Sequence, residues 1–157
     1  MFGFFKKKQT EDLKAYVSGE AIKIEDVNDG VFSEKILGEG MAIIPSEELL
    51  ISPCDGTICS VADTKHAVGI QLNNGMQLLL HIGLDTVSMS GEGFLVHVKE
   101  GQSVKEGQNL ISFDRTKIKE AGYADTVIMI VTENENSKSL NFHYGNVLHG
   151  ETIIVDF

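Results

Sequence analysis

The sequence contains little cysteine and little proline, and it has no long hydrophobic segment. Two cysteines, Cys54 and Cys59, are too few for a disulfide framework, and their spacing does not match the paired hooks of a zinc ribbon. We therefore expect free structural thiols. With only Pro45 and Pro53 present, no proline-rich linker divides the chain. No apolar run approaches the length of about 18 residues that a membrane-spanning helix needs.

Basic residues are also scarce, with 13 Lys and Arg against 23 Asp and Glu in 157 residues, for a formal net charge of −10. This balance argues against nucleic acid as a ligand, because binding to a phosphate backbone requires a basic patch. It favours partners with cationic surfaces. The charge is uneven, because Lys6, Lys7 and Lys8 lie in the first eight residues without any acidic neighbour.

Residues 1–12 are interpreted as a tail and residues 13–157 as a single domain. The tail begins with aromatic residues followed by lysines, which is the reverse of a secretory signal, and glycine is third rather than second, which disfavours myristoylation. A cytoplasmic protein is expected. Residues 1–8 form either a frayed end or an apolar and cationic tip that contacts an anionic membrane surface.

Short β-prone runs separated by glycine-containing turns indicate an all-β fold, a sandwich or barrel with at most short helices. One helix is expected from Arg115 to Ala121, with Asp114 as N-cap and Gly122 as its stop. Two turn-plus-strand patterns recur, which suggests a duplicated motif. The expected strands are residues 49–52, 57–61, 67–72, 76–82, 94–98, 109–113, 127–132 and 152–157.

His81 interrupts an apolar run that is typical of a buried strand, and His66 precedes the neighbouring predicted strand. The residues Asn73, Asn74 and Gly75 predict a hairpin between these strands. Either two-residue turn places both imidazoles on one face, with backbones about 5–8 Å apart. A three-residue loop would instead place them on opposite faces.

Two adjacent imidazoles have three chemical uses. They can bind a metal with a third ligand, act as an acid–base pair, or combine a phosphoryl acceptor with a hydrogen-bond donor. The neighbours favour the third use, because Thr64 and Thr86 can orient the rings and Gly83 permits close approach of a partner. Asp85 is a candidate contact for a basic donor protein.

Six segments around these histidines occur in a fixed order: residues 29–33, 38–45, 64–70, 75–87, 91–94 and 101–107. Together they closely resemble the glucose-type IIA domain of the bacterial phosphoenolpyruvate:sugar phosphotransferase system, over about residues 17–155. The resemblance implies a β-sandwich of the duplicated-hybrid-motif kind, with both histidines in a shallow apolar depression.

The resemblance also implies roles for individual residues. His81 matches the acceptor of a phosphoryl group on Nε2, given by the carrier HPr and passed on to a cysteine of a IIB domain. His66 matches the residue that supports this onward transfer, and Thr64 matches the threonine that hydrogen-bonds within the pair. The partner-docking rim is matched by Val31 and Phe32 on its apolar part and by Asp29 and Asp85 on its acidic part. The implied activity is that of a phosphotransferase component that needs no cofactor.

Two other functions are weighed beside the carrier. A zinc peptidase is suggested by His81 and Asp85, but those enzymes need a later H-x-H pair, and His143 and His149 are six residues apart. No metal is required, although His66 and His81 form a candidate weak zinc pair. A regulatory protein that acts on transporters or metabolic enzymes according to its phosphorylation state is compatible with the carrier role. Nothing in the sequence identifies the sugar.

Overall fold

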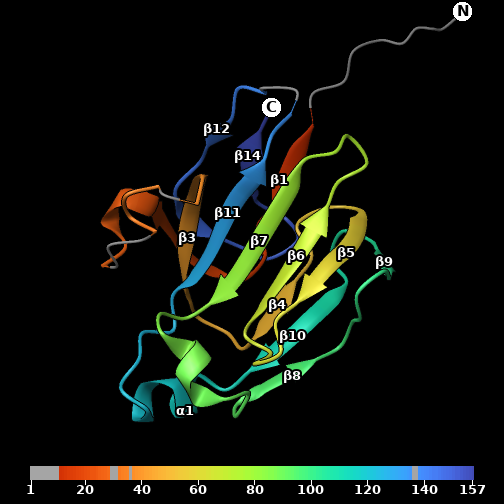
Figure 1. The fold of residues 1–157 in the computed structure, drawn as a ribbon. Coiled ribbons are helices and arrows are strands. Elements are labelled where there is room, and N and C mark those ends of the chain that lie inside the picture. The colour runs from red at the N-terminus through yellow and green to blue at the C-terminus, as the bar shows by residue number, and fades with distance from the viewer. Residues whose placement is uncertain (1–10, 29–31, 36, 136–137) are drawn as a thin grey trace, which may run out of the picture.

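The computed structural model describes residues 11–28, 32–35, 37–135 and 138–157. Within them the chain forms fourteen strands, one short α-helix and two 3-10 helices, which confirms the expected all-β class. Figure 1 shows the strands stacked in layers, with α1 at the end of the molecule opposite the C-terminus. The elements are β1 (Asp12–Lys14), β2 (Gly19–Lys23), η1 (Ile24–Asp26), β3 (Glu39–Pro45), β4 (Leu49–Ile51), β5 (Gly56–Val61), β6 (Ala67–Gln71), β7 (Gln77–Ile82), η2 (Thr86–Met89), β8 (Phe94–Val96), β9 (Ser103–Val104), β10 (Asn109–Phe113), α1 (Arg115–Glu120), β11 (Val127–Glu133), β12 (Asn141–Phe142), β13 (Gly145–Val147) and β14 (Ile153–Asp156).

An eight-stranded antiparallel sheet is the main layer, in the order β13-β2-β3-β11-β7-β6-β5-β9. Two three-stranded sheets, β4-β10-β8 and β1-β14-β12, accompany it. The first strand pairs with the last, since Asp12 lies opposite Asp156. Alternate residues of a strand point to opposite faces, so each strand of the main sheet serves two environments.

One face of the main sheet builds the principal core. Leu78, Leu80 and Ile82 of β7 are buried in one cluster with side chains of the small sheets, such as Leu50 of β4 and Ile154 of β14. Burial of these apolar side chains is the main stabilising contribution, at about 25 cal/mol per Å².

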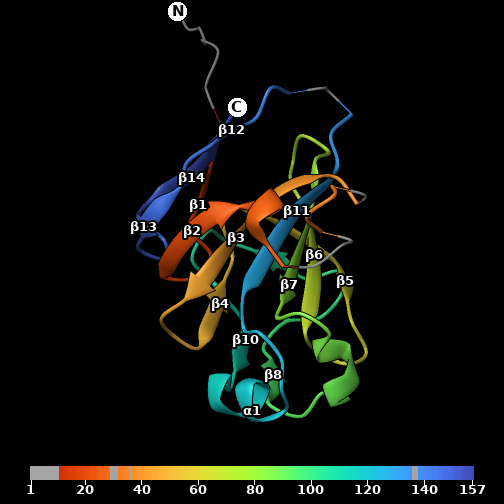
Figure 2. The same ribbon diagram turned by 90° about the vertical axis from the view of Figure 1, so that its left-hand side faces the viewer.

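The opposite face of the same strands carries a smaller apolar cluster. Ile128 and Ile130 of β11 pack there with Ala42 of β3 and with Ile24 of η1 and Phe32. Figure 2 shows η1 lying in front of the sheet at this face. His81, which alternates with the core residues of β7, lies on this second face.

The expected helix is confirmed in detail. It spans Arg115–Glu120, and the Asp114 side chain accepts a hydrogen bond from the Lys117 backbone N–H at 3.0 Å, as an N-cap does. After the helix the chain turns at Gly122, whose φ of +91° suits glycine. Several strands were not expected, chiefly β2 and β3 in the main sheet.

Candidate functional site

His81 lies in the middle of the main sheet. Its strand β7 runs between β6 and β11, where Ala67 and Ile128 lie opposite His81. The imidazole is half-buried, because the apolar cluster of Ile128, Phe32 and their neighbours surrounds it on this face. A position inside a continuous antiparallel ladder fixes the backbone of His81 rigidly.

A hydrogen bond to the backbone determines which nitrogen of the His81 imidazole carries the proton. Its Nδ1 lies 2.9 Å from the carbonyl oxygen of Gly83. Since a carbonyl only accepts, Nδ1 carries the proton and donates it. In the neutral ring this leaves the lone pair on Nε2, the nitrogen that can act as a nucleophile.

The Gly83 carbonyl can reach His81 because the chain turns sharply after β7. Gly83 has a φ of +80°, and a Cβ there would collide with Thr86 and lie 2.9 Å from the Ala124 carbonyl oxygen. Only glycine fits this backbone and this space. Asp85 and Lys65 also have positive φ, of 63° and 67°. Strained backbone of this kind is concentrated at functional sites.

His66 lies directly against His81, with ring centroids 4.7 Å apart and the rings nearly perpendicular at 84°. Its Nδ1 is 2.9 Å from the Thr64 hydroxyl oxygen, as expected for that threonine. The side chain is buried, and burial lowers the pKa of the His66 imidazole, although a hydrogen bond with the Thr64 backbone opposes this. A neutral His66 that accepts from Thr64 presents an N–H donor at Nε2.

The hairpin between β6 and β7 takes the third of the registers considered from the sequence, and neither two-residue turn forms. Ala67 pairs with His81 and Gln71 with Gln77, which is the register of the three-residue loop. In that register His66 would face away from His81 if it belonged to the strand. However, β6 begins only at Ala67, and Lys65, just before His66, has a left-handed backbone. The alternation of faces along the strand therefore does not extend to the His66 side chain.

Two aromatic rings flank the histidine pair. Phe32 is tilted against His81 at a centroid distance of 5.1 Å, and Phe94 lies 6.4 Å from the His66 ring. Phe32 had been expected at the rim, whereas no local pattern predicts the contact of Phe94, which comes from the distant strand β8. The rings limit the access of water to the imidazoles and leave them in a largely apolar setting.

The remaining predicted site residues differ in their burial and in whether the structure describes them. Asp85 is exposed at the start of η2, next to Val87, whose side chain is 53% exposed. Thr86 does not orient a ring, because it is buried and its hydroxyl donates to the Ile82 carbonyl. The predicted residues Asp29 and Val31 lie outside the described residues.

The other histidines belong to separate contacts at the surface. His97 lies near Ser112, His143 near Asp156 and His149 near Glu47, and all three histidines are exposed. Among the described residues, no group of three His, Cys, Asp or Glu side chains could hold a metal ion. Cys54 and Cys59 are both free, and burial raises the pKa of the Cys54 thiol to about 12.

The geometry combines a nucleophilic imidazole nitrogen with a second imidazole that can donate a hydrogen bond beside it. Such an arrangement can take up a charged group from one macromolecule and pass it to another, with the second imidazole stabilising negative charge during transfer.

Comparison with known proteins points the same way. Residues 11–137 match the family described as phosphoenolpyruvate-dependent sugar phosphotransferase system, EIIA 1. The chain is 41% identical over 145 residues to the glucose-specific EIIA component of Bacillus cereus, covering 92% of this chain and 88% of that protein. It is 40% identical over 159 residues to the component of the same name in Staphylococcus aureus, covering 99% and 95%. Its structure resembles the glucose permease IIA of Mycoplasma capricolum, with a TM-score of 0.88, 34% identity and coverage of 98% and 99%.

Proposed function

The chain belongs to the EIIA 1 family of the phosphoenolpyruvate-dependent sugar phosphotransferase system, and from this premise we propose that His81 is its phosphoryl acceptor. As a member, the protein is a phosphocarrier that works between HPr and a IIB domain. The observation that supports His81 most is the hydrogen bond from its Nδ1 to the Gly83 carbonyl, which leaves the lone pair on Nε2.

In the proposed step, the Nε2 lone pair of His81 attacks the phosphorus of the phosphohistidine on HPr. A new N–P bond forms at His81, and the N–P bond of the donor breaks, so that the donor imidazole keeps the electron pair. No proton has to leave His81, because Nδ1 keeps its hydrogen and its bond to Gly83. In the onward step, the thiolate of a IIB cysteine attacks the phosphorus, an S–P bond forms, and the N–P bond at His81 breaks so that Nε2 recovers its lone pair.

His66 supports the transfer by donating a hydrogen bond to the phosphoryl oxygens. Its ring stands against that of His81, and in this proposal the Thr64 hydroxyl donates to its Nδ1, which leaves Nε2–H as the donor to the transferring group. A preorganised donor of this kind contributes about 2.7–4 kcal/mol to transition-state stabilisation in oxyanion holes.

We also propose that partners dock on the rim around the pair. Val87 supplies exposed apolar surface, and Asp85 supplies the acidic contact for a basic carrier, whereas Phe32, expected at the rim, is buried against His81. The same rim suits the alternative role of regulating transporters or metabolic enzymes. A membrane contact of residues 1–8 stays a prediction, because these residues lie outside the described part of the chain.

The chain is further proposed to act as one cytoplasmic domain over residues 13–157. The pairing of β1 with β14 and the family match from residue 11 support this unit. None of the helices formed by the described residues has the length and hydrophobicity needed to cross a membrane. The glucose-specific names of the relatives favour a glucose-type permease as the destination of the phosphoryl group.

The proposal is tested with phosphoenolpyruvate, enzyme I, HPr and a glucose-type IIB domain. We expect that His81→Ala takes up no label from phospho-HPr. His66→Gln should still be labelled but should pass the group on poorly, because the onward transfer loses its donor. His97→Gln is the matched control and should behave as the unmodified protein. Full labelling of His81→Ala would overturn the assignment of the acceptor.

A further inference from the structure

Asp125 is a buried carboxylate for which the transfer chemistry has no direct use. It is 5% exposed and lies in the connection between α1 and β11. The Nε of Arg115 donates to its Oδ2 at 2.8 Å, and the Nζ of Lys119 is 3.6 Å from the same oxygen. A buried carboxylate needs such partners, because desolvation without them is costly.

Arg115, the nearer of the two cations, is itself held at its backbone. Arg115 is the first residue of α1, and its backbone N–H donates to the Glu48 carboxylate at 2.9 Å. The first turn of the helix is therefore held by the Asp114 cap and by Glu48. From this helix, the side chains of Arg115 and Lys119 extend to Asp125. Figures 1 and 2 both show α1 beside the connection to β11 at one end of the molecule, with η2 at the same end.

Asp125 stands between the two residues that hold the turn after His81. The carbonyl of Ala124 accepts from the Leu84 N–H at 3.1 Å, and the carbonyl of Thr126 accepts from the Gly83 N–H at 2.7 Å. Fixing the side chain of the residue between these carbonyls fixes both of them. The close approach of Ala124 to Gly83 shows how little freedom the turn has.

We propose that the ion pair of Arg115 and Asp125 is the positioning element that sets the tautomer of the phosphoryl acceptor. The pair holds the two carbonyls, these hold Gly83, and the Gly83 carbonyl keeps the proton of His81 on Nδ1. If Gly83 shifts, the proton can reside on Nε2, and a ring in that tautomer has no lone pair there to attack phosphorus. This inference rests on the proposed function of His81.

The test uses Asp125→Ala and the double variant Arg115→Met/Lys119→Met, with the full chain in each case. The double variant replaces one partly buried and one exposed side chain, and it remains informative if Asp125→Ala folds poorly. Lys14→Met is the matched control, since it removes the Lys14–Glu106 ion pair of 3.0 Å on β1. Nitrogen-15 NMR of the imidazoles reports the tautomer of His81, and rapid quench reports the rate constant for uptake from phospho-HPr.

We expect both variants to show a population of His81 protonated on Nε2 and an uptake rate constant that is about 10-fold lower, the loss typical of removing an outer partner of a reacting group. Lys14→Met should keep the Nδ1–H tautomer and stay within about twofold of the unmodified rate. A His81 that stays protonated only on Nδ1 in both variants would overturn the inference, whatever the rate. Failure of the proposed function is distinct, since the unmodified protein would then not be labelled on His81.

Discussion

At the scale of single residues, the two histidines differ because their hydrogen-bond partners differ. His81 donates to a carbonyl, which fixes one tautomer, whereas His66 meets a hydroxyl, which can donate or accept. His66 is also the more deeply buried of the two. The contact of His81 therefore selects one tautomer of its ring, whereas the contact of His66 permits both.

The lowered pKa of His66 leads to a prediction about stability and pH. The unfolded chain binds a proton at His66 near its ordinary pKa of about 6.5, while the folded chain binds it only at lower pH. The unfolded state therefore holds more protons between the two values, so stability must fall as the pH drops below about 6.5.

We expect that the free energy of unfolding falls less between pH 8 and pH 5.5 in His66→Gln than in the unmodified protein. Urea denaturation at the two pH values measures this difference. The exposed His97 provides the control, because His97→Gln should follow the unmodified protein. An equal loss in His66→Gln and the unmodified protein would show that His66 is not the group concerned.

At the scale of elements, the sequence predicts those parts of the fold that local chemistry decides. The strand Asn109–Phe113 and the start of α1 after its Asp114 cap lie where the sequence places them. The strand β3 was not predicted, because Gly40 and Pro45 weaken its local preference. In the fold, Gly40 is required since a Cβ there would collide with the Met129 carbonyl of β11.

The sequence likewise predicted some of the residues of the site and missed others. His81, His66 and Thr64 could be found from the sequence, because the resemblance covers them and they lie close together along the chain. Their contact was expected from a two-residue turn, whereas it occurs with the three-residue loop, where a left-handed residue precedes β6. The Gly83 acceptor and Phe94 depend on tertiary structure, which no local pattern contains.

The turn after β7 allows a direct test with glycine. Gly83→Ala combines backbone strain with a collision against Thr86 and Ala124, and should destabilise the protein by about 2–5 kcal/mol. It should also slow the uptake of phosphate, because the carbonyl that accepts from His81 is displaced.

The matched control for this test is Gly101→Ala. Gly101 has a similar φ of +90°, but a Cβ there meets nothing within 4 Å. It therefore carries only the backbone cost of about 1–2 kcal/mol. Urea denaturation and rapid quench compare the two variants. Equal destabilisation and unchanged uptake in both would show that the packing around Gly83 is unimportant.

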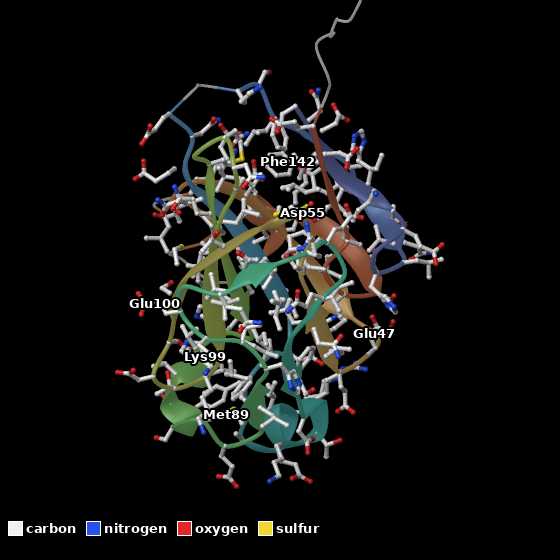
Figure 3. All side chains as sticks on the ribbon, turned by 90° about the vertical axis from the view of Figure 1, so that its right-hand side faces the viewer. Glu47, Asp55, Met89, Lys99, Glu100 and Phe142 are labelled. Atoms are coloured by element: carbon white, nitrogen blue, oxygen red, sulfur yellow. The ribbon has the colours of Figure 1, made fainter. Side chains whose placement is uncertain are left out.

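At the scale of the whole molecule, the excess of acidic residues is spread over several elements. Glu47, Asp55 and Glu100, labelled in Figure 3, come from three different connections between strands. An acidic surface of this extent attracts a basic partner over distances beyond direct contact and accelerates association. Asp85, beside the histidine pair, places part of this charge at the proposed rim.

We expect kcat/KM for uptake from HPr to fall by about 10-fold when NaCl is raised from 50 to 500 mM, because salt screens the attraction. The rate at saturating HPr should change little, since it no longer depends on encounter. Rapid-quench kinetics at several salt concentrations measure both kcat/KM and the rate at saturating HPr. Asp85→Asn should weaken the salt dependence more than Glu100→Gln, and a kcat/KM insensitive to salt would contradict electrostatic steering.

The central claim, that His81 carries the phosphoryl group on Nε2, the nitrogen that bears the lone pair in the neutral ring, is tested most directly by locating that group. The unmodified protein is phosphorylated by phospho-HPr and examined by nitrogen-15 and phosphorus-31 NMR. The account predicts one N–P bond, at Nε2 of His81, with Nδ1 still protonated and bound to Gly83. A phosphoryl group on Nδ1 of His81, or on His66, would contradict it.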